Sequence, residues 1–161
     1  MSKFFEDIAI GERIELGSFL FTADDIVRYA REYDPQRFHL SEEEAAKTHF
    51  GRLCASGWHT ACVYMKLMVA YRGSADALMR QRGERVARLG GSPGFRELRW
   101  LKPVYAGDRI AYAHTVTDKR SSASRPEWGI IQFLNEGRNQ NGDMVFDFKG
   151  TAFVERRGRD R

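Results

Sequence analysis

The sequence predicts an α+β fold in which an antiparallel sheet wraps around a long central helix. Between Gly57 and Arg72, Lys66 is the only charged residue before the arginine, and apolar side chains cover nearly the whole helical circumference, which is typical of a core helix. Beyond Gly83 the hydrophobic pattern has a period of two, which indicates strands at residues 95–102, 108–119, 127–138 and 144–155. Because the helices precede the strands, the order excludes a doubly wound nucleotide-binding fold.

Length and composition indicate one globular domain. The chain has 161 residues, of which 42% are hydrophobic and 30% are charged, so it can build a real core. No apolar run reaches the roughly 18 residues of a membrane span, and the first residues lack the basic and apolar blocks of a secretory signal. We therefore expect a cytoplasmic protein without membrane contact. We expect the domain to cover residues 1–155 and residues 156–161 to form a basic flexible tail.

The charge pattern and the two cysteines exclude several classes of protein. The net charge is +4, of which residues 155–161 contribute +2, since four arginines there face two acids. The remainder is mildly basic and has no dense basic stripe, so nucleic-acid binding is not expected. Cys54 and Cys62 form neither a CxxC motif nor a disulfide framework, and we interpret both as reduced and buried. His49, Cys54 and His59 lack a fourth ligand at matching spacing, so no metal is expected.

Local signals predict the remaining elements. Thr22 has the spacing of a helix cap, and apolar residues follow it at intervals of three and four, so we expect a helix at residues 23–33. Ser41 opens a second, short helix by the same capping logic. Residues 4–14 are compatible with an edge strand or a packed loop, and Asn141-Gly142 predicts a hairpin between the last two strands. We expect the last four strands to form an antiparallel meander.

The polar residues between positions 33 and 60 have the composition of a catalytic segment. Pro35 ends the preceding helix, so Asp34 and His39 lie five residues apart in a stiffened loop, where both side chains can point at one spot. Histidine exchanges protons near neutral pH, and a carboxylate beside it can orient a water. Gly57 opens the core helix, whose first amides are free to bind an oxyanion. Asp34 is also compatible with a simple turn residue, and Gly57 with close packing alone.

This segment resembles the hydratase motif of the MaoC-like family, which contains (R)-specific enoyl-CoA hydratases and acyl dehydratases. Later stretches similar to the family's sheet are Gly-Ser-Pro-Gly (91–94), Leu-Arg-Trp-Leu-Lys-Pro-Val (98–104) and Ala-Gly-Asp (106–108). The resemblance implies a hot-dog fold, a homodimer or larger homo-oligomer, and reversible hydration of an enoyl thioester with no cofactor beyond the coenzyme A of the substrate. It also implies that Asp34 and His39 activate one water and that the Gly57 amide binds the thioester oxygen.

Several positions depart from the family motif Gly-Asp-x-Asn-Pro-x-His. Tyr33, Gln36 and Arg37 replace its Gly, Asn and Pro, and Ser56 stands before the helix-start glycine in place of the usual histidine. Gln36 keeps an amide that can hydrogen-bond the water or the carboxylate, whereas Arg37 can pair with that carboxylate or face the solvent. The candidate substrate-binding residues are Gln36, Ser56 and Trp58.

Two other functions remain open. A hot-dog thioesterase usually has a carboxylate on or beside the central helix, and residues 57–72 contain no Asp or Glu. A non-catalytic acyl-CoA-binding protein is the second alternative, since Gln36 and Arg37 depart from the motif. Other conspicuous side chains are interpreted as core in preference to the lining of an acyl tunnel (Tyr64, Met65 and Met68), as structural residues of the sheet (Trp100 and His114), or as surface cations compatible with coenzyme A phosphates (Lys119, Arg120 and Arg125).

Overall fold

The structure is a computed structural model that describes residues 3–158. The elements in chain order are η1 (Phe5–Asp7), β1 (Arg13–Leu20), α1 (Ala23–Tyr33), α2 (Arg37–Leu40), α3 (Glu42–Ala46), α4 (Gly57–Gln81), β2 (Phe95–Trp100), β3 (Arg109–Ser121), β4 (Trp128–Arg138) and β5 (Met144–Glu155). The predicted helix at residues 23–33 and the four predicted strands are confirmed, and residues 13–20 form an edge strand.

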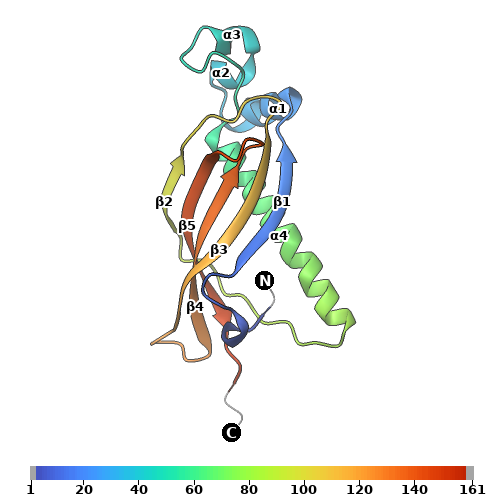
Figure 1. The fold of residues 1–161 in the computed structure, drawn as a ribbon, viewed down its shortest axis with the longest axis vertical. Helices are drawn as coiled ribbons and strands as arrows, with labels where there is room; N and C mark the ends of the chain where they lie inside the picture. The colour runs from blue at the N-terminus through green and yellow to red at the C-terminus, as the bar shows by residue number, and fades with distance from the viewer. Residues whose placement is uncertain (1–2, 159–161) are drawn as a thin grey trace.

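One antiparallel sheet of five strands, in the order β1-β3-β4-β5-β2, packs along α4. The short helices α1, α2 and α3 gather at one end of this sheet, and the C-terminal turns of α4 emerge beyond it (Figure 1). A long helix held against one curved antiparallel sheet is the hot-dog fold that the sequence predicted. The helices at the end of the sheet lie near the first turn of α4, where the predicted catalytic segment is found.

The core lies between α4 and the inner face of the sheet. Alternate residues of β3 share one face of the sheet, and those that face α4 are all buried, namely Ile110, Tyr112, His114 and Val116. The ring of Tyr64 on α4 lies 6.2 Å from that of Tyr112, and the Tyr112 hydroxyl donates a hydrogen bond to the Thr60 carbonyl at 3.1 Å. Apolar packing and this hydrogen bond together hold the first half of α4 on the sheet.

The strand order differs from the predicted meander. β3, β4 and β5 do follow one another, and Gly142, with a φ of 82°, lies in the turn that joins the last two. β2, however, pairs with β5 at the sheet edge opposite β1. The segment after β2 crosses the end of the sheet, where the Ala55 amide donates to the Val104 carbonyl at 2.7 Å. Alternation along a strand specifies which side chains share a face but not which strand lies beside it, so the prediction was wrong here.

The central helix is longer and less buried than predicted. α4 continues past Arg72 to Gln81, and Gly83, with a φ of 71°, follows its end. Met65 and Val69 are 50% and 57% exposed, so one side of α4 faces away from the core and the interpretation of Met65 as a core residue is wrong. Among the described residues, no helix is long and apolar enough to cross a membrane.

The two cysteines have different environments. Both are free thiols, but Cys54 is buried whereas Cys62 is exposed, with its sulfur 3.5 Å from the Tyr29 hydroxyl. The prediction of a buried thiol is therefore right for Cys54 and wrong for Cys62. The reason is the same partial exposure of α4, since Cys62 lies on its outer side.

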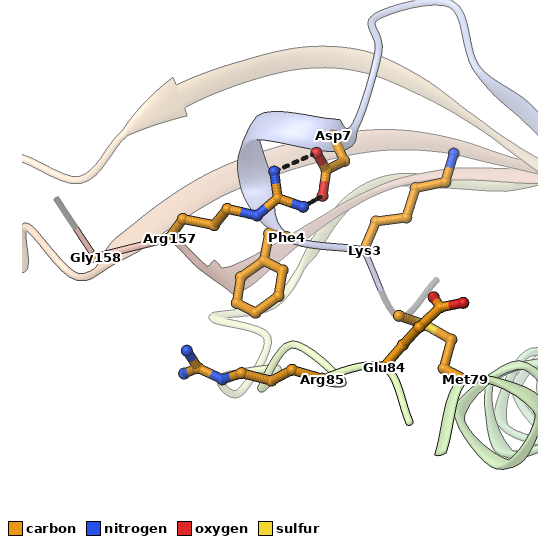
Figure 2. A pocket seen from close by; sticks show the side chains of 8 residues that line it. All are labelled: Lys3, Phe4, Asp7, Met79, Glu84, Arg85, Arg157 and Gly158. Carbon is orange, nitrogen blue, oxygen red and sulfur yellow. Dashed lines mark hydrogen bonds and ion pairs between the residues drawn. The ribbon is translucent and has the colours of Figure 1, made fainter. Parts of the chain in front are cut away.

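The N-terminal segment packs against the end of β5 (Figure 2). The Arg157 guanidinium donates two hydrogen bonds to the Asp7 carboxylate, at 2.8 and 2.6 Å, and lies 5.2 Å from the centre of the Phe4 ring. Arg156 forms an ion pair with Glu6 at 3.4 Å. Residues 156–157, which the sequence assigned to a flexible tail, are thus held by ion pairs. Residues 159–161 of that predicted tail lie outside the described residues.

Lys119 is engaged by the same N-terminal segment. Its ammonium group donates hydrogen bonds to the carbonyl oxygens of Phe5 and Ile8, at 2.9 and 2.6 Å. These bonds tie β3 to the start of the chain. Lys119 is therefore a structural residue of the described chain, which weakens its interpretation as a phosphate-binding cation.

Candidate active site

Asp34 lies at the C-terminal end of α1, directly before Pro35. The Thr22 hydroxyl begins this helix by accepting a hydrogen bond from the Asp25 amide at 3.1 Å, and a proline cannot continue it. The Asp34 amide still donates to the Ala30 carbonyl at 3.0 Å, but its φ of −153° turns the chain away from the helix. The end of α1 therefore directs the Asp34 carboxylate toward the following residues.

His39 lies on α2, a single helical turn where the sequence predicted a loop. The His39 amide donates to the Gln36 carbonyl at 2.9 Å, which closes the turn. This turn carries the imidazole back toward the end of α1. As a result, Nε2 of His39 lies 3.5 Å from Oδ2 of Asp34, so the structure brings these two predicted residues together.

The second ring nitrogen of His39 determines what Nε2 can do. Nδ1 lies 2.7 Å from the Cys54 carbonyl oxygen, and because a carbonyl only accepts, we assign the ring hydrogen to Nδ1. When Nδ1 carries the only ring hydrogen, Nε2 has a lone pair. The ring is 5% exposed and contacts Phe38 edge-on at 4.5 Å, so its orientation is held on several sides. A lone pair and the Asp34 carboxylate both accept, so a water that donates to both fits this arrangement.

The Asp34 carboxyl group is ionised at neutral pH. Burial raises its pKa, but the hydrogen bonds with Ser56 and Gln36 and the nearby His39 together lower it by more. The pKa therefore lies below its ordinary value of 3.8. The Gln36 side-chain amide donates to Oδ1 of Asp34 at 2.8 Å, which confirms that this residue can hydrogen-bond the carboxylate. Arg37 is exposed and faces the solvent.

The first turn of α4 lies beside this pair. The Ser56 hydroxyl caps the helix by accepting a hydrogen bond from the Trp58 amide at 3.2 Å. The Gly57 amide has no hydrogen-bond partner among residues 3–158. A Cβ atom at Gly57 would lie only 2.5 Å from the Trp100 indole, so glycine is needed for this close contact. Both interpretations of Gly57, close packing and a free helix-start amide, are compatible with this geometry.

These groups line one cavity of about 420 Å³. All six candidate residues of the sequence face it, namely Asp34, Gln36, His39, Ser56, Gly57 and Trp58. The sequence missed several other lining residues: Phe38, Phe50, Trp100, Leu101, Lys102, Val104 and Val145. Trp100 belongs here although it was interpreted as structural. Its place follows from the pairing of β2 with β5, for which the sequence contains no local signal.

His59 is a buried histidine outside this cavity. Its ring stacks on Tyr29 with centroids 4.4 Å apart, and burial lowers its pKa to about 4, so it is neutral at neutral pH. Within the described chain, no group of three or more His, Cys, Asp or Glu side chains is placed to hold a metal ion. The stacking on Tyr29 gives His59 a structural role within α4.

The fold and the site define a hot-dog domain with a polar cavity at the start of its central helix, and known proteins share this architecture. A family model described as a MaoC-like domain matches residues 7–128, so the chain belongs to the MaoC-like domain family. The crystal structure of the MaoC-like dehydratase from Rhodospirillum rubrum has a TM-score of 0.78 and 33% sequence identity, covering 98% of this chain and 99% of that chain.

Two curated relatives differ in how much of this chain they match. The uncharacterized protein YdeM of Bacillus subtilis is 28% identical over 94% of this chain and 98% of its own length. A mesaconyl-CoA hydratase of Haloarcula marismortui is 32% identical, but the match covers 40% of this chain and only 18% of the hydratase. The match to YdeM therefore covers nearly the whole of both proteins, whereas the match to the hydratase is limited to a shorter segment.

Proposed function

We propose that this protein catalyses the reversible hydration of an enoyl thioester, and the corresponding dehydration of a 3-hydroxyacyl thioester. The main observation in support is that Asp34, His39 and the free Gly57 amide line the same cavity. Membership in the MaoC-like family and the similarity to a mesaconyl-CoA hydratase support the same reaction class. Coenzyme A is the expected carrier of the acyl group.

In the proposed mechanism a water donates hydrogen bonds to the Asp34 carboxylate and to Nε2 of His39. As the water oxygen attacks Cβ of the enoyl group, Nε2 takes one proton, and the ionised carboxylate stabilises the imidazolium that forms. The electron pair of the double bond moves onto the thioester oxygen, where the Gly57 amide stabilises the negative charge. A proton from the pair then reaches Cα, which completes the addition of water.

The lining of the cavity also suits a thioester substrate. Trp58, Trp100 and Val104 form apolar walls next to the polar pair, so an acyl group can pack there. In a thioesterase we expect a carboxylate on the central helix, but no acidic residue of α4 lines this cavity. This difference favours hydration over thioester hydrolysis.

We also propose that the protein acts as a homodimer or larger homo-oligomer. β2 forms an edge of the sheet, and large apolar side chains on this strand, directly after it and on α4 are exposed in the single chain: Phe95, Trp100, Leu101, Met65 and Val69. Exposed apolar surface next to an unpaired strand is typical of a subunit interface. Sedimentation equilibrium tests this directly, and a monomer at micromolar concentration contradicts it.

The test of the reaction follows the absorbance of the enoyl-CoA double bond. Crotonyl-CoA and longer trans-2-enoyl-CoA esters are incubated with the wild type, with Asp34→Asn and with His39→Gln. His49→Gln is the matched control, since His49 is exposed and does not line the cavity. Near-normal rates in both site variants reject the mechanism. Release of free thiol indicates a thioesterase, and thermal stabilisation by enoyl-CoA without turnover indicates a binding protein.

A further inference from the structure

A second cavity of about 320 Å³ lies between α4 and the sheet, beyond the predicted catalytic residues. Its walls are largely apolar and include Met65, Met68, Phe95, Phe133 and Phe148. No Asp or Glu is among the described residues that line it. A cavity of this composition suits a hydrocarbon chain, and the flexible methionines allow its shape to adapt.

Two polar atoms in these apolar surroundings lack a partner. Nε2 of His114 and Nε of Arg72 are buried and make no hydrogen bond within residues 3–158, and both residues line the cavity. His114 is only 6% exposed, and burial lowers its pKa to about 4, so its ring is neutral at neutral pH. Buried polar atoms without partners destabilise a fold, so a ligand that offers hydrogen-bond acceptors to them is favoured.

The polar groups nearby do not already satisfy these atoms. Tyr64 and Asn135, which also line the cavity, hydrogen-bond to each other, and Asn135 further donates to the Phe148 carbonyl at 3.3 Å. Glu12, whose charge acts on His114, is paired with Lys3 at 2.7 Å. The unmet hydrogen-bonding capacity therefore belongs to His114 and Arg72.

The cavity at Gly57 and the second cavity are neighbours along α4, with shared wall residues between them. Between them lies a smaller cavity of about 120 Å³, whose wall contains Trp58 from the first and Tyr64, Met65, Phe95 and Phe148 from the second. At about 1.5 Å per residue, Tyr64 lies roughly 10 Å and Arg72 roughly 22 Å along the helix from Gly57. A chain that starts at the Gly57 amide can therefore run along α4 into the second cavity.

We propose that this second cavity binds the distal end of the acyl chain, and that Arg72 and His114 recognise a carboxylate at that end. The inference rests on the proposed function, because the thioester group must lie at the Gly57 amide for the chain to reach this far. Arg72 has only donors, and the neutral His114 ring donates when its hydrogen is on Nε2. A carboxylate accepts from both, whereas a terminal methyl group leaves both unsatisfied.

The kinetic test compares pairs of trans-2-enoyl-CoA substrates of equal length that end in a methyl group or in a carboxylate. Octenoyl, dodecenoyl and hexadecenoyl chains are used, because they reach different depths. At the chain length that reaches Arg72 and His114, kcat/KM should be about tenfold to a hundredfold higher for the carboxylate-ended substrate than for the methyl-ended one. This ratio corresponds to one or two charge-assisted hydrogen bonds. Crotonyl-CoA, which is too short to reach the second cavity, measures the reaction itself.

Three variants locate the preference. Arg72→Met and His114→Phe should each remove most of it while crotonyl-CoA turnover stays within about twofold of the wild type. Arg80→Met, on the same helix but outside the cavity, is the matched control and should keep the preference. If His114→Phe does not fold, Arg72→Met alone decides. The proposal is overturned if the wild type shows no preference for the carboxylate-ended substrate at any length, or if that preference survives Arg72→Met. A buried water is then the partner of these atoms.

A binding experiment separates failure of this proposal from failure of the proposed function. Calorimetry compares the saturated octanoyl-, dodecanoyl- and hexadecanoyl-CoA with their ω-carboxylated counterparts, which need no turnover. Tighter binding of the carboxylated ligand that is lost in Arg72→Met supports the subsite even if no enoyl-CoA is hydrated. Turnover of crotonyl-CoA with equal binding of both ligand types rejects the subsite and retains the hydratase.

Discussion

Nε2 of His39 lies 3.5 Å from Oδ2 of Asp34, while Nδ1 of the same ring lies 2.7 Å from the Cys54 carbonyl oxygen. The carbonyl holds the ring hydrogen on the side away from the carboxylate. When Nε2 carries no hydrogen, two acceptors therefore lie side by side at the cavity, and a water in front of them can donate to both. This relationship is the basis of the proposed activation of water and leads to the first prediction.

Replacing either member of the pair should abolish most turnover without unfolding the protein. Asp34→Asn keeps the size of the side chain but loses the charge, and His39→Gln loses the proton acceptor. Each should lower kcat by about a hundredfold to ten-thousandfold, because general acid–base catalysis contributes on that order. Steady-state kinetics measures the loss, and circular dichroism with thermal melting shows whether the fold is kept. A loss below about tenfold in both variants contradicts the assigned roles.

The hydrogen bond from Gln36 should help to keep Asp34 ionised. Gln36 donates to the carboxylate at 2.8 Å and lowers its pKa, so Gln36→Leu should raise that pKa. Carbon NMR titration of the labelled Asp34 carboxyl group measures the change. Gln36→Glu is not a suitable control, since it adds a charge, but Gln36→Asn keeps the amide and should produce a smaller shift. An unchanged titration in Gln36→Leu shows that other partners alone determine the pKa.

The start of α4 allows the free amide to be tested apart from packing. Gly57→Ala should destabilise the fold by about 1 to 3 kcal/mol, because its Cβ atom would overlap the Trp100 indole. In a Trp100→Ala background this overlap is removed. There Gly57→Ala keeps the amide hydrogen, whereas Gly57→Pro removes it at a helix position that proline tolerates. Ser56, with φ −56° and ψ 141°, already has a conformation suited to a following proline.

The expected difference between those two double variants is catalytic. Gly57→Pro should lower kcat by a further factor of about a hundred to a thousand relative to Gly57→Ala, as for loss of one oxyanion donor. Chemical denaturation should show similar stability for both, which separates the two effects. Equal kcat values would mean that the thioester oxygen binds elsewhere.

Much of the site could be predicted because its signals are local. Thr22, Pro35 and Gly57 are capping, breaking and opening residues, and their effects depend on their immediate neighbours along the chain. The contact of Trp100 with Gly57 could not be predicted, because it depends on β2 pairing with β5. Period-two alternation is the same in every strand order, so it contains no information on that pairing.

The length and exposure of α4 show the same limit. Apolar residues around the whole helix predicted full burial, yet Met65 and Val69 are exposed in the single chain. The pattern specifies how much apolar surface must be covered but not whether the cover comes from this chain or from a second one. A second copy of the chain, as in the proposed oligomer, would cover the excess.

A last prediction concerns Glu155, a buried carboxylate at the end of β5. Its oxygens accept hydrogen bonds from the Arg85 side chain at 2.6 Å and from the Arg88 amide at 2.8 Å. Burial raises its pKa, but the Arg88 amide and the charges of Arg85 and Arg88 lower it by more, so the pKa lies below 4.5 in the folded state. Glu155→Gln should therefore lower the free energy of unfolding by about 1 to 2 kcal/mol at neutral pH.

The pH dependence of that loss has a definite sign. Because folding lowers the Glu155 pKa, its carboxylate stabilises the fold above pH 4.5, and this contribution disappears as the pH falls through the folded-state pKa. The difference between wild type and Glu155→Gln, measured by urea denaturation, should be full at neutral pH and shrink in acid. Glu127→Gln, at an exposed position, is the matched control and should show no such trend. A difference that stays constant with pH would mean that the variant acts through altered packing and not through the lost charge.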